Sequence, residues 1–266
     1  GPFGGQIDQV RVFNYARSAS QIAYAYNRGG PVGWWKLDEC QGASAYDSSG
    51  NSNTGTITIG ASGTQTTAGT CTGSANTAWK DGATGKRNSS LDFDGTDDYI
   101  NATAPSSLSS ASVFSVAFWA NASTYAATNA AFSLRIGTND AVNLFIIYPY
   151  DTLNGNGARV FFNNITIINL NSTTVSAGSW HQFTYVQRSA TDRELYIDGL
   201  SAATNTTSKT LPAVTNLTLG SWDGTQQFFT GQIDDVKVFN YALTPLQVKL
   251  QYNNGAVNFS PSTGAP

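Results

Sequence analysis

The stretch Gly231-Gln-Ile-Asp-Asp-Val-Lys-Val-Phe-Asn-Tyr-Ala242 indicates the fold class of this 266-residue chain. Its apolar and polar residues alternate, which is typical of a strand with one buried face. Nearly the same residues stand at Gly5-Gln-Ile-Asp-Gln-Val-Arg-Val-Phe-Asn-Tyr-Ala16, where ten of the twelve positions are identical. The offset between the two copies, 231 minus 5, is 226 residues. An offset of this length indicates a whole domain repeated in series.

Each copy predicts a strand followed by a short helix. In the second copy, Thr244 is suited to cap the helix and Pro245 to occupy its first position. We therefore expect residues 1–30 to hold the closing strand and short helix of an upstream repeat. Residues 31–255 would form one complete domain, and residues 256–266 would begin a linker. The alternative, in which the first copy joins this domain by permutation or strand exchange, stays open.

Short strand patterns alternate with turn residues between the two copies. Only 12% of the residues are charged, and Ser, Thr, Asn and Gly are abundant, which favours strands and turns over helices. We expect an all-β fold, a two-sheet antiparallel jelly-roll sandwich with short helices after the closing strand. The predicted strands are 32–38, 98–102, 113–121, 131–137, 142–149, 158–169, 180–187, 194–198, 215–220 and 231–240.

Composition also bears on partners and location. The net charge is −3 and Lys and Arg form no run, so nucleic-acid binding is not expected. The sequence has no apolar stretch near the roughly 20 residues of a membrane span, so membrane insertion is not expected. A disulfide between Cys40 and Cys71, the only cysteines, would indicate an oxidising compartment; two free thiols are the alternative. Eight Asn-x-Ser/Thr sequons suit a secreted or cell-surface protein. Gly1-Pro2 is typical of a cleaved tag, so we expect the natural N-terminus to be missing.

Seven motifs follow one another in a recognisable order. They are Gly33-Trp-Trp-Lys-Leu-Asp-Glu39, Asp47-Ser-Ser-Gly-Asn-Ser-Asn-Thr-Gly55, Leu91-Asp-Phe-Asp-Gly-Thr-Asp-Asp-Tyr99, Phe114-Ser-Val-Ala-Phe-Trp119, Gly178-Ser-Trp-His-Gln182, Leu195-Tyr-Ile-Asp-Gly199 and the closing stretch quoted first. With them the chain resembles the laminin G-like jelly-roll family, within the concanavalin A-like lectin/glucanase superfamily. The resemblance covers most of residues 31–255 and implies the same sandwich. The surroundings of Cys71 depart from the family pattern and predict a loop insertion.

Oxygen-bearing side chains after the first predicted strand are suited to calcium. Ca²⁺ takes six to eight oxygen ligands, and Asp47, Asn51 and Asn53 offer such oxygens at close spacing around a glycine. An Asx-turn at Asp47 is the alternative interpretation. The sequence thus leaves both a cation site and a turn open for this segment.

The resemblance adds a ligand from the closing strand. In jelly-roll relatives such as the family 16 glucanases, an Asp of that strand ligates a structural calcium, and its equivalent here is Asp234, with Asp8 in the first copy. Antiparallel first and last strands would bring Asp38 or Glu39 close to Asp234, although a solvated strand end is the alternative. We therefore expect a structural Ca²⁺ bound by residues from the following set: Asp234, Asp47, Glu39, Asn51 and Asn53.

Sugar binding requires an aromatic surface beside groups that hydrogen-bond hydroxyls. Trp222-Asp223 and Tyr148-Pro-Tyr150-Asp151 have this chemistry in turn-rich stretches, so we predict Trp222, Asp223, Tyr148, Tyr150 and Asp151 as carbohydrate-binding residues. Burial at the edge of the sandwich is the alternative for Trp222. The tryptophans of the strand motifs, Trp34, Trp35 and Trp119, are expected in the core.

Catalytic signatures are weak in this sequence. The Glu-x-Asp-x-x-Glu arrangement of the family 16 hydrolases has no match, and His181, the only histidine, is expected to be a packed structural residue. The acidic cluster of Asp92, Asp94, Asp97 and Asp98 is better explained by turns than by a metal. We expect a non-enzymatic lectin-like module that binds carbohydrate or glycoprotein in adhesion, with neighbouring repeats of the same chain as further partners. The alternative is a structural spacer with a calcium-stabilised fold and no ligand of its own.

Overall fold

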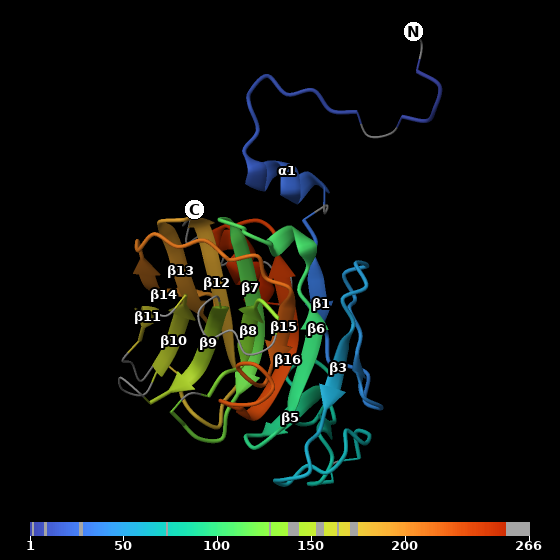
Figure 1. Cartoon of the computed structure of the whole chain (residues 1–266), viewed down its shortest axis with the longest axis vertical. Coiled ribbons are helices and arrows are strands. Elements are labelled where there is room, and N and C mark those ends of the chain that lie inside the picture. Colours follow the sequence, from blue (N-terminus) through green and yellow to red (C-terminus); the bar gives the residue numbers. More distant parts are fainter. Residues whose placement is uncertain are drawn as a thin grey trace, which may run out of the picture.

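The computed structural model describes residues 1, 3–7, 10–26, 29–72, 74–127, 129–137, 144–152, 157–163, 165–170 and 175–253. Two antiparallel sheets of eight strands each pack into a β-sandwich (Figure 1). The first sheet has the order β14 (Leu200–Asn205), β13 (Asp192–Ile197), β12 (His181–Ser189), β7 (Phe114–Asn121), β16 (Thr230–Phe239), β5 (Ser90–Asp94) and β4 (Trp79–Lys80), with β1 (Gly33–Trp35) also paired to β16. The second has the order β11 (Ile165–Asn169), β10 (Gly157–Phe162), β9 (Leu144–Asp151), β8 (Phe132–Arg135), β15 (Asn216–Leu219), β6 (Tyr99–Thr103), β3 (Gly55–Thr58) and β2 (Ser44–Ala45).

The two-sheet antiparallel sandwich confirms the predicted fold class. Strand β16 lies inside its sheet, between β7 and β5, and buries Ile233, Val236 and Val238 in the core. A bulge interrupts its pairing with β7 between Asp234 and Lys237, and Asp235 has a positive φ of 48°. An extra residue in a strand changes which side chains face the core. Asp234 and Asp235 therefore both lie on the face of the sheet that points away from the core.

Most predicted strands are present with small changes in their bounds. The predicted strand 158–169 is two strands, β10 and β11, because the chain turns at Asn163, which has a positive φ of 44°. The short strands β2 to β5 and strand β14 were missed in the prediction. Strands β2, β3, β4 and β14 are short or polar and give little periodic signal, so only their partners in the sheets make them strands. Strand β5 does alternate, with Leu91 and Phe93 buried, and its signal was overlooked.

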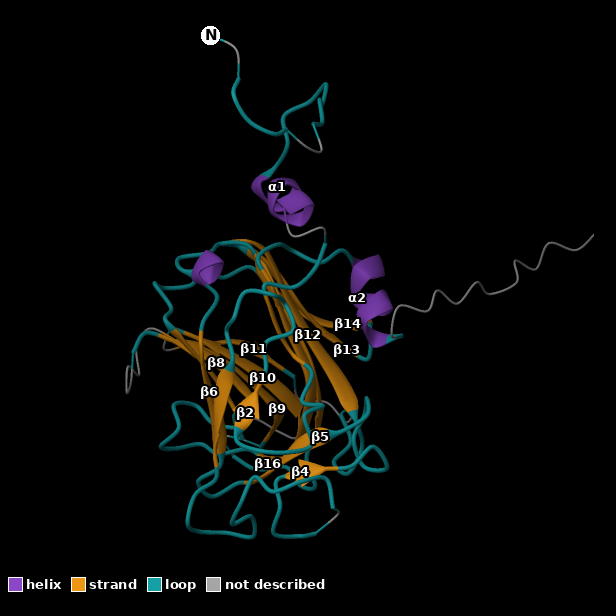
Figure 2. Cartoon of the chain, turned by 90° about the vertical axis from the view of Figure 1, so that its right-hand side faces the viewer, coloured by secondary structure: helices purple, strands orange, loops and turns teal. Residues whose placement is uncertain are grey.

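The two sequence copies differ in structure. The second forms β16 and then α2 (Pro245–Tyr252), which starts with a capping box between Thr244 and Gln247. The first copy forms the helix α1 (Ala19–Tyr26) but not the predicted strand: its described residues leading up to α1 run away from the sandwich without a strand partner (Figures 1 and 2). Asp8 and the predicted linker at 256–266 lie outside the described residues. A short 3-10 helix (Ser106–Leu108) is the third helical element in the described part of the chain.

A long irregular loop between β3 and β4 contains Cys71 and the surroundings that the sequence predicts to be an insertion. A disulfide joins Cys71 to Cys40, as expected from the cysteine count, and Trp79 Nε1 donates a hydrogen bond of 2.9 Å to the carbonyl of Gly42. These contacts attach the loop to the segment that follows β1.

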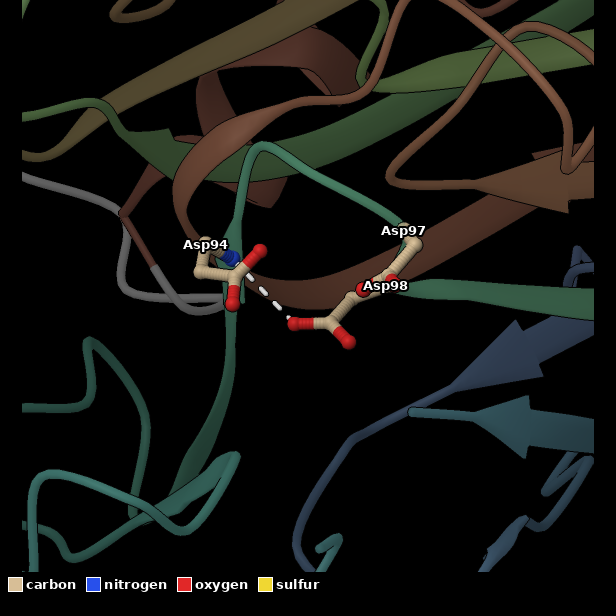
Figure 3. Close-up of side chains that lie close together, drawn as sticks. All are labelled: Asp94, Asp97 and Asp98. Carbon is tan, nitrogen blue, oxygen red and sulfur yellow. Dashed lines mark hydrogen bonds between the residues drawn. The ribbon is translucent and has the colours of Figure 1, made fainter. Parts of the chain in front are cut away.

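Three carboxylates hold the other end of this loop. Asp94, Asp97 and Asp98 have oxygens within 4.8 Å of one another (Figure 3). Their oxygens accept hydrogen bonds from backbone N–H groups of the loop, namely Gly60 to Asp98 (3.1 Å), Ser62 to Asp97 (2.9 Å) and Thr64 to Asp94 (2.7 Å). Burial, together with the charges of Asp94 and Asp97, raises the pKa of Asp98 to about 6. This arrangement supports the predicted role of the acidic cluster in a turn.

Removal of the disulfide should destabilise the domain. Cross-linking two residues about 30 positions apart restricts the unfolded chain, so the Cys40→Ala/Cys71→Ala variant should lose about 3 kcal/mol of unfolding free energy. Urea denaturation monitored by tryptophan fluorescence measures this loss, and the wild-type protein with added dithiothreitol is the control. An unchanged denaturation midpoint in both samples would contradict the prediction.

The acidic cluster should make stability depend on pH. Between the ordinary value of 3.8 and about 6, folded Asp98 retains a proton that the unfolded chain releases, so the unfolding free energy should fall as pH rises through this window. Asp98→Asn should remove this part of the dependence, because an amide cannot titrate. Thermal melts at half-unit pH steps test it, with Asp192→Asn as an exposed control. Parallel pH profiles for wild type and Asp98→Asn would show that Asp98 has no such role.

Candidate functional site

The segment predicted to ligate calcium after β1 forms a compact turn. Asp47 accepts hydrogen bonds from the backbone N–H groups of Trp34, Ser49 and Asn53, each at 2.9 Å. The side-chain amides of Asn51 and Asn53 both donate to the carbonyl of Val32 at 3.1 Å. Burial alone would raise the pKa of Asp47, but these hydrogen bonds outweigh it and hold the pKa below its ordinary value. The turn therefore engages the oxygens of Asp47 without a cation.

The remaining predicted ligands lie in separate places. Glu39 accepts a 2.7 Å hydrogen bond from the backbone N–H of Tyr46, and burial raises its pKa. In the described part of the chain, one group of three acidic side chains converges within 4.8 Å, and it contains none of Asp47, Glu39 and Asp234. Asp47, Asn51 and Asn53 thus share one turn, whereas Glu39 contacts Tyr46 and Asp234 contacts the loop before β5.

Asp234 is a buried carboxylate whose two oxygens differ in their hydrogen bonds. Its side chain is fully buried, and Oδ2 accepts hydrogen bonds from the backbone N–H groups of Lys86 (2.9 Å) and Arg87 (2.6 Å). Its other oxygen, Oδ1, is buried with no hydrogen-bond partner in the structure. Burial first, and then the charges of Asp235 and Asp38, raise the pKa of Asp234 to about 8. Such a carboxylate gains stability from either a proton or a cation.

The aromatic residues predicted to bind sugar are mostly buried. The hydroxyl of Tyr150 donates within the core towards the carbonyls of Ala120 (3.0 Å) and Ser179 (2.9 Å). Asp151 forms a buried ion pair with Arg159 at 2.7 Å. Both residues therefore serve the packing of the sandwich, and the structure does not support their predicted contact with a ligand.

The other predicted residues meet on the outer face of the second sheet. The guanidinium carbon of Arg159 lies 3.9 Å from the ring centroid of Tyr148, and Tyr148 is 3% exposed. Trp222 is half-buried against a small apolar cluster that includes Tyr148. Asp223 is buried and accepts hydrogen bonds from Thr225 and Gln226, which hold its pKa below the ordinary value despite its burial. Tyr148 and Trp222 thus lie together, as the sequence grouped them, but Tyr148 and Asp223 are buried.

An open groove of about 740 Å³ lies on the outer face of the first sheet. We call it the outer-face groove. Strand β1 and the residues after it, the loop before β5, the strands β7 and β16, and helix α2 each contribute to its walls. Its lining residues include Trp34, Lys36, Asp38, Lys86, Arg87, Trp119, Asp235, Lys237 and Tyr252.

Charged groups and aromatic rings alternate around this groove. Asp235 accepts a 2.7 Å hydrogen bond from Trp34 Nε1 and pairs with Arg87 (3.2 Å) and Lys237 (2.8 Å). The ammonium groups of Lys36 and Lys86 have no carboxylate partner among the described residues, and they lie 4.5 and 4.3 Å from the ring centroids of Trp34 and Trp119. With four basic and two acidic side chains in its lining, the groove is positively charged in a chain whose net charge is −3.

Sequence reasoning missed this groove. Trp34 was expected in the core, but it lines the groove while its neighbour Trp35 is fully buried. The signal was the two-residue period of a strand, because a buried Trp35 sends Trp34 and Lys36 to the opposite face. Trp119 is 2% exposed, as expected of a packed residue, but its indole Nε1 has no hydrogen-bond partner among the described residues.

The only histidine connects two turns. His181 Nδ1 lies 2.6 Å from Asp198 Oδ2, and Nε2 lies 3.1 Å from both the backbone N and the hydroxyl of Ser176. This is the order of a Ser-His-Asp triad, but a general base needs its lone pair for the hydroxyl proton alone. Here the backbone N–H of Ser176 shares that lone pair, so the arrangement is that of a structural link.

Comparisons with known structures give the same fold. Domain 4 of the extracellular GH43 arabinanase AbnA from Geobacillus stearothermophilus, solved with arabinotriose, is 21% identical at a TM-score of 0.61, covering 83% of this chain and 97% of that one. The binding domain of Paraclostridial Mosquitocidal Protein 1 is 13% identical at a TM-score of 0.54, covering 86% and 53%. Trypanosoma rangeli sialidase is 10% identical at a TM-score of 0.57, covering 84% and 32%. The chain thus spans about half or less of the last two.

Other comparisons add a family but no near relative. A search of curated proteins finds no match. Helices in the described residues are all too short or too polar to cross a membrane. The profile named Laminin_G_3 matches residues 94–249, which is more than half of the chain. The chain therefore belongs to this laminin G-like family of the concanavalin A-like lectin/glucanases superfamily.

Proposed function

We propose that this chain is a non-catalytic carbohydrate-binding module of a secreted or cell-surface protein, and that the outer-face groove is its ligand site. The observation that carries the proposal is the groove itself, which combines the partly exposed indole of Trp34, two ammonium groups without a carboxylate partner in the described part of the chain, and several hydrogen-bonding side chains. The arabinotriose complex of a structurally similar domain supports a sugar as the ligand class. The disulfide is consistent with an extracellular location.

The charges of the groove favour an acidic sugar. Lys36 and Lys86 can each donate to a carboxylate or sulfate group, since neither is neutralised by a protein carboxylate among the described residues. Asp235 is already engaged by Trp34, Arg87 and Lys237, so its charge is compensated. The ligand we expect is therefore a glycan that carries uronate or sulfate groups, presented by a polysaccharide or a glycoprotein in adhesion.

Calcium binding by Asp234 is the second part of the proposal. The Oδ1 atom, which has no partner among the described residues, and the neighbouring carboxylate of Asp38 fit a cation, which would replace the proton on Asp234 and stabilise the bulge of β16. This observation also favours the alternative function, a spacer domain with a calcium-stabilised fold. The two functions differ in whether the groove binds a glycan.

Removal of the unpaired charges should weaken glycan binding. Lys36→Gln and Lys86→Gln each delete a charge-assisted hydrogen bond, and the affinity for a uronate or sulfate glycan should drop by about tenfold or more per substitution. A glycan array with acidic and neutral glycans, followed by calorimetry on the hits, measures the effect. The binding should also weaken as salt rises.

Two control variants locate the site. Lys249→Gln removes the same charge from an exposed position of α2 outside the groove and should bind like wild type. Trp222→Ala alters the outer face of the second sheet and should also leave binding intact. Binding lost in Trp222→Ala but retained in Lys36→Gln would place the ligand on the second sheet. If no glycan on the array binds, the spacer function is favoured.

Calcium should stabilise the fold through Asp234. A ligand that binds only the folded state raises Tm, so CaCl₂ should raise the Tm of EDTA-treated protein by several degrees. Asp234→Asn should abolish this response, and because an amide resembles the protonated carboxyl, it should leave the Tm in EDTA nearly unchanged. Asp47→Asn is the comparison, and it should retain the calcium response at a lower overall Tm. A calcium response that persists in Asp234→Asn would rule out this residue as the ligand.

A further inference from the structure

Helix α1 repeats α2 in its position within the sequence copy and in its N-terminal capping. Its bounds, Ala19–Tyr26, correspond to those of α2, Pro245–Tyr252, at the same offset of 226 residues. In α1, Gln21 N donates to Ser18 Oγ (3.2 Å) and Ser18 N to Gln21 Oε1 (3.0 Å), which repeats the capping box of Thr244 and Gln247. The sequence copy therefore extends through the helix as a folded unit.

The apolar residues before α1 are exposed, whereas their counterparts in β16 are buried. Val236 and Val238 of β16 are fully buried, whereas the equivalent Val10 and Val12 are 74% and 93% exposed. The ring pair Phe239 and Tyr241, which closes a buried cluster, is repeated by the exposed pair Phe13 and Tyr15 in the same edge-to-face arrangement. An exposed apolar strand sequence of this kind requires partner strands.

Gly5 points to the kind of partner. Its counterpart Gly231 lies so close to β7 that a Cβ atom would stand 2.3 Å from the carbonyl oxygen of Asn121. In this structure, the ring of Phe3 is the neighbour of Gly5 within 4 Å, so no strand requires a glycine there. A glycine at this position fits a strand that lies against another strand as β16 lies against β7.

Helix α1 contacts this domain with one face and leaves the other free. The ring of Tyr24 packs edge-on against Tyr241 at 5.3 Å, and the hydroxyl of Tyr241 donates to the carbonyl of Gly29 at 2.8 Å. Ile22 is 57% exposed, although its counterpart in α2, Val248, is fully buried against the domain that α2 closes. Figure 2 shows α1 at the end of the sandwich and α2 along its side.

We propose that residues 5–26 are the closing strand and helix of a second sandwich of the same fold, and that α1 is the joint between the two domains. Residues 5–16 pair between the β5- and β7-equivalent strands of that upstream domain, and Ile22 packs into it as Val248 packs here. The contact between Tyr24 of α1 and Tyr241 then joins the upstream domain to this one. The proposal does not depend on a glycan binding in the outer-face groove.

An extended chain tests the proposal. Residues 31–230 are placed directly before Gly5 of the full chain, which supplies the upstream domain in register with its closing strand. Hydrogen exchange then compares residues 7–13 in the extended and the original chain. We expect exchange to slow at least a hundredfold on extension. Equal exchange rates in the two chains would overturn the proposal.

A matched pair of variants controls for indirect effects. Val12→Asp should leave the melting of the original chain unchanged, because the side chain is 93% exposed there. In the extended chain the same change should restore fast exchange in residues 7–13 and unfold the upstream domain at a lower temperature. The same small effect in both chains would contradict the pairing. A dimer of the original chain that Val12→Asp dissociates would identify a second copy as the partner and also overturn the proposal.

The joint has its own readout. Tyr24→Ala in the extended chain should leave residues 7–13 protected but loosen the relative orientation of the two domains, which small-angle X-ray scattering detects as a larger radius of gyration. An unchanged scattering profile would show that the Tyr24–Tyr241 contact does not hold the domains together.

Discussion

The pairing of β16 with its neighbours is the constraint on which the rest of the structure depends. This ten-residue strand hydrogen-bonds to β7 and β5 and also to β1, and it buries Ile233, Val236 and Val238 between the sheets. A strand inside a sheet must satisfy backbone groups on both sides, so its sequence is restricted at nearly every position. Gly231, which pairs with Phe93 of β5, approaches the backbone of β7 too closely for any side chain.

The bulge in β16 connects this constraint with the chemistry of the surface. Because the register shifts between Asp234 and Lys237, the side chains of Asp234 and Asp235 both lie on the face of the sheet that points away from the core. Asp235 then organises the basic residues and Trp34 in the outer-face groove. Asp234 is buried beneath the loop that carries Lys86 and Arg87, where one of its oxygens has no partner. The bulge of β16 thus places Asp235 in the lining of the outer-face groove and Asp234, the candidate ion ligand, beneath the loop before β5.

The same closing unit occurs twice in the chain with different outcomes. The second copy, which has partner strands, forms a strand and a docked helix; in the first copy the helix forms, and the described residues before it form no strand. The difference follows from where the hydrogen bonds are made. A helix satisfies its backbone internally and here has a capping box, whereas a strand needs neighbours.

The sequence by itself determined the sandwich class, the closing strand with its capped helix, and the acidic turn, because alternation, capping residues and turn residues are local signals. It also grouped Tyr148 with Trp222. Tertiary structure decided which polar residues are accessible: Tyr150 and Asp151 are buried, Asp47 is engaged by a turn, and Trp34 lines a groove instead of the core. Burial of a side chain depends on strands distant in sequence and on the register of their pairing, and a single bulge changes it. No local pattern in residues 231–242 encodes that shift, which only the packing of β16 against β7 reveals.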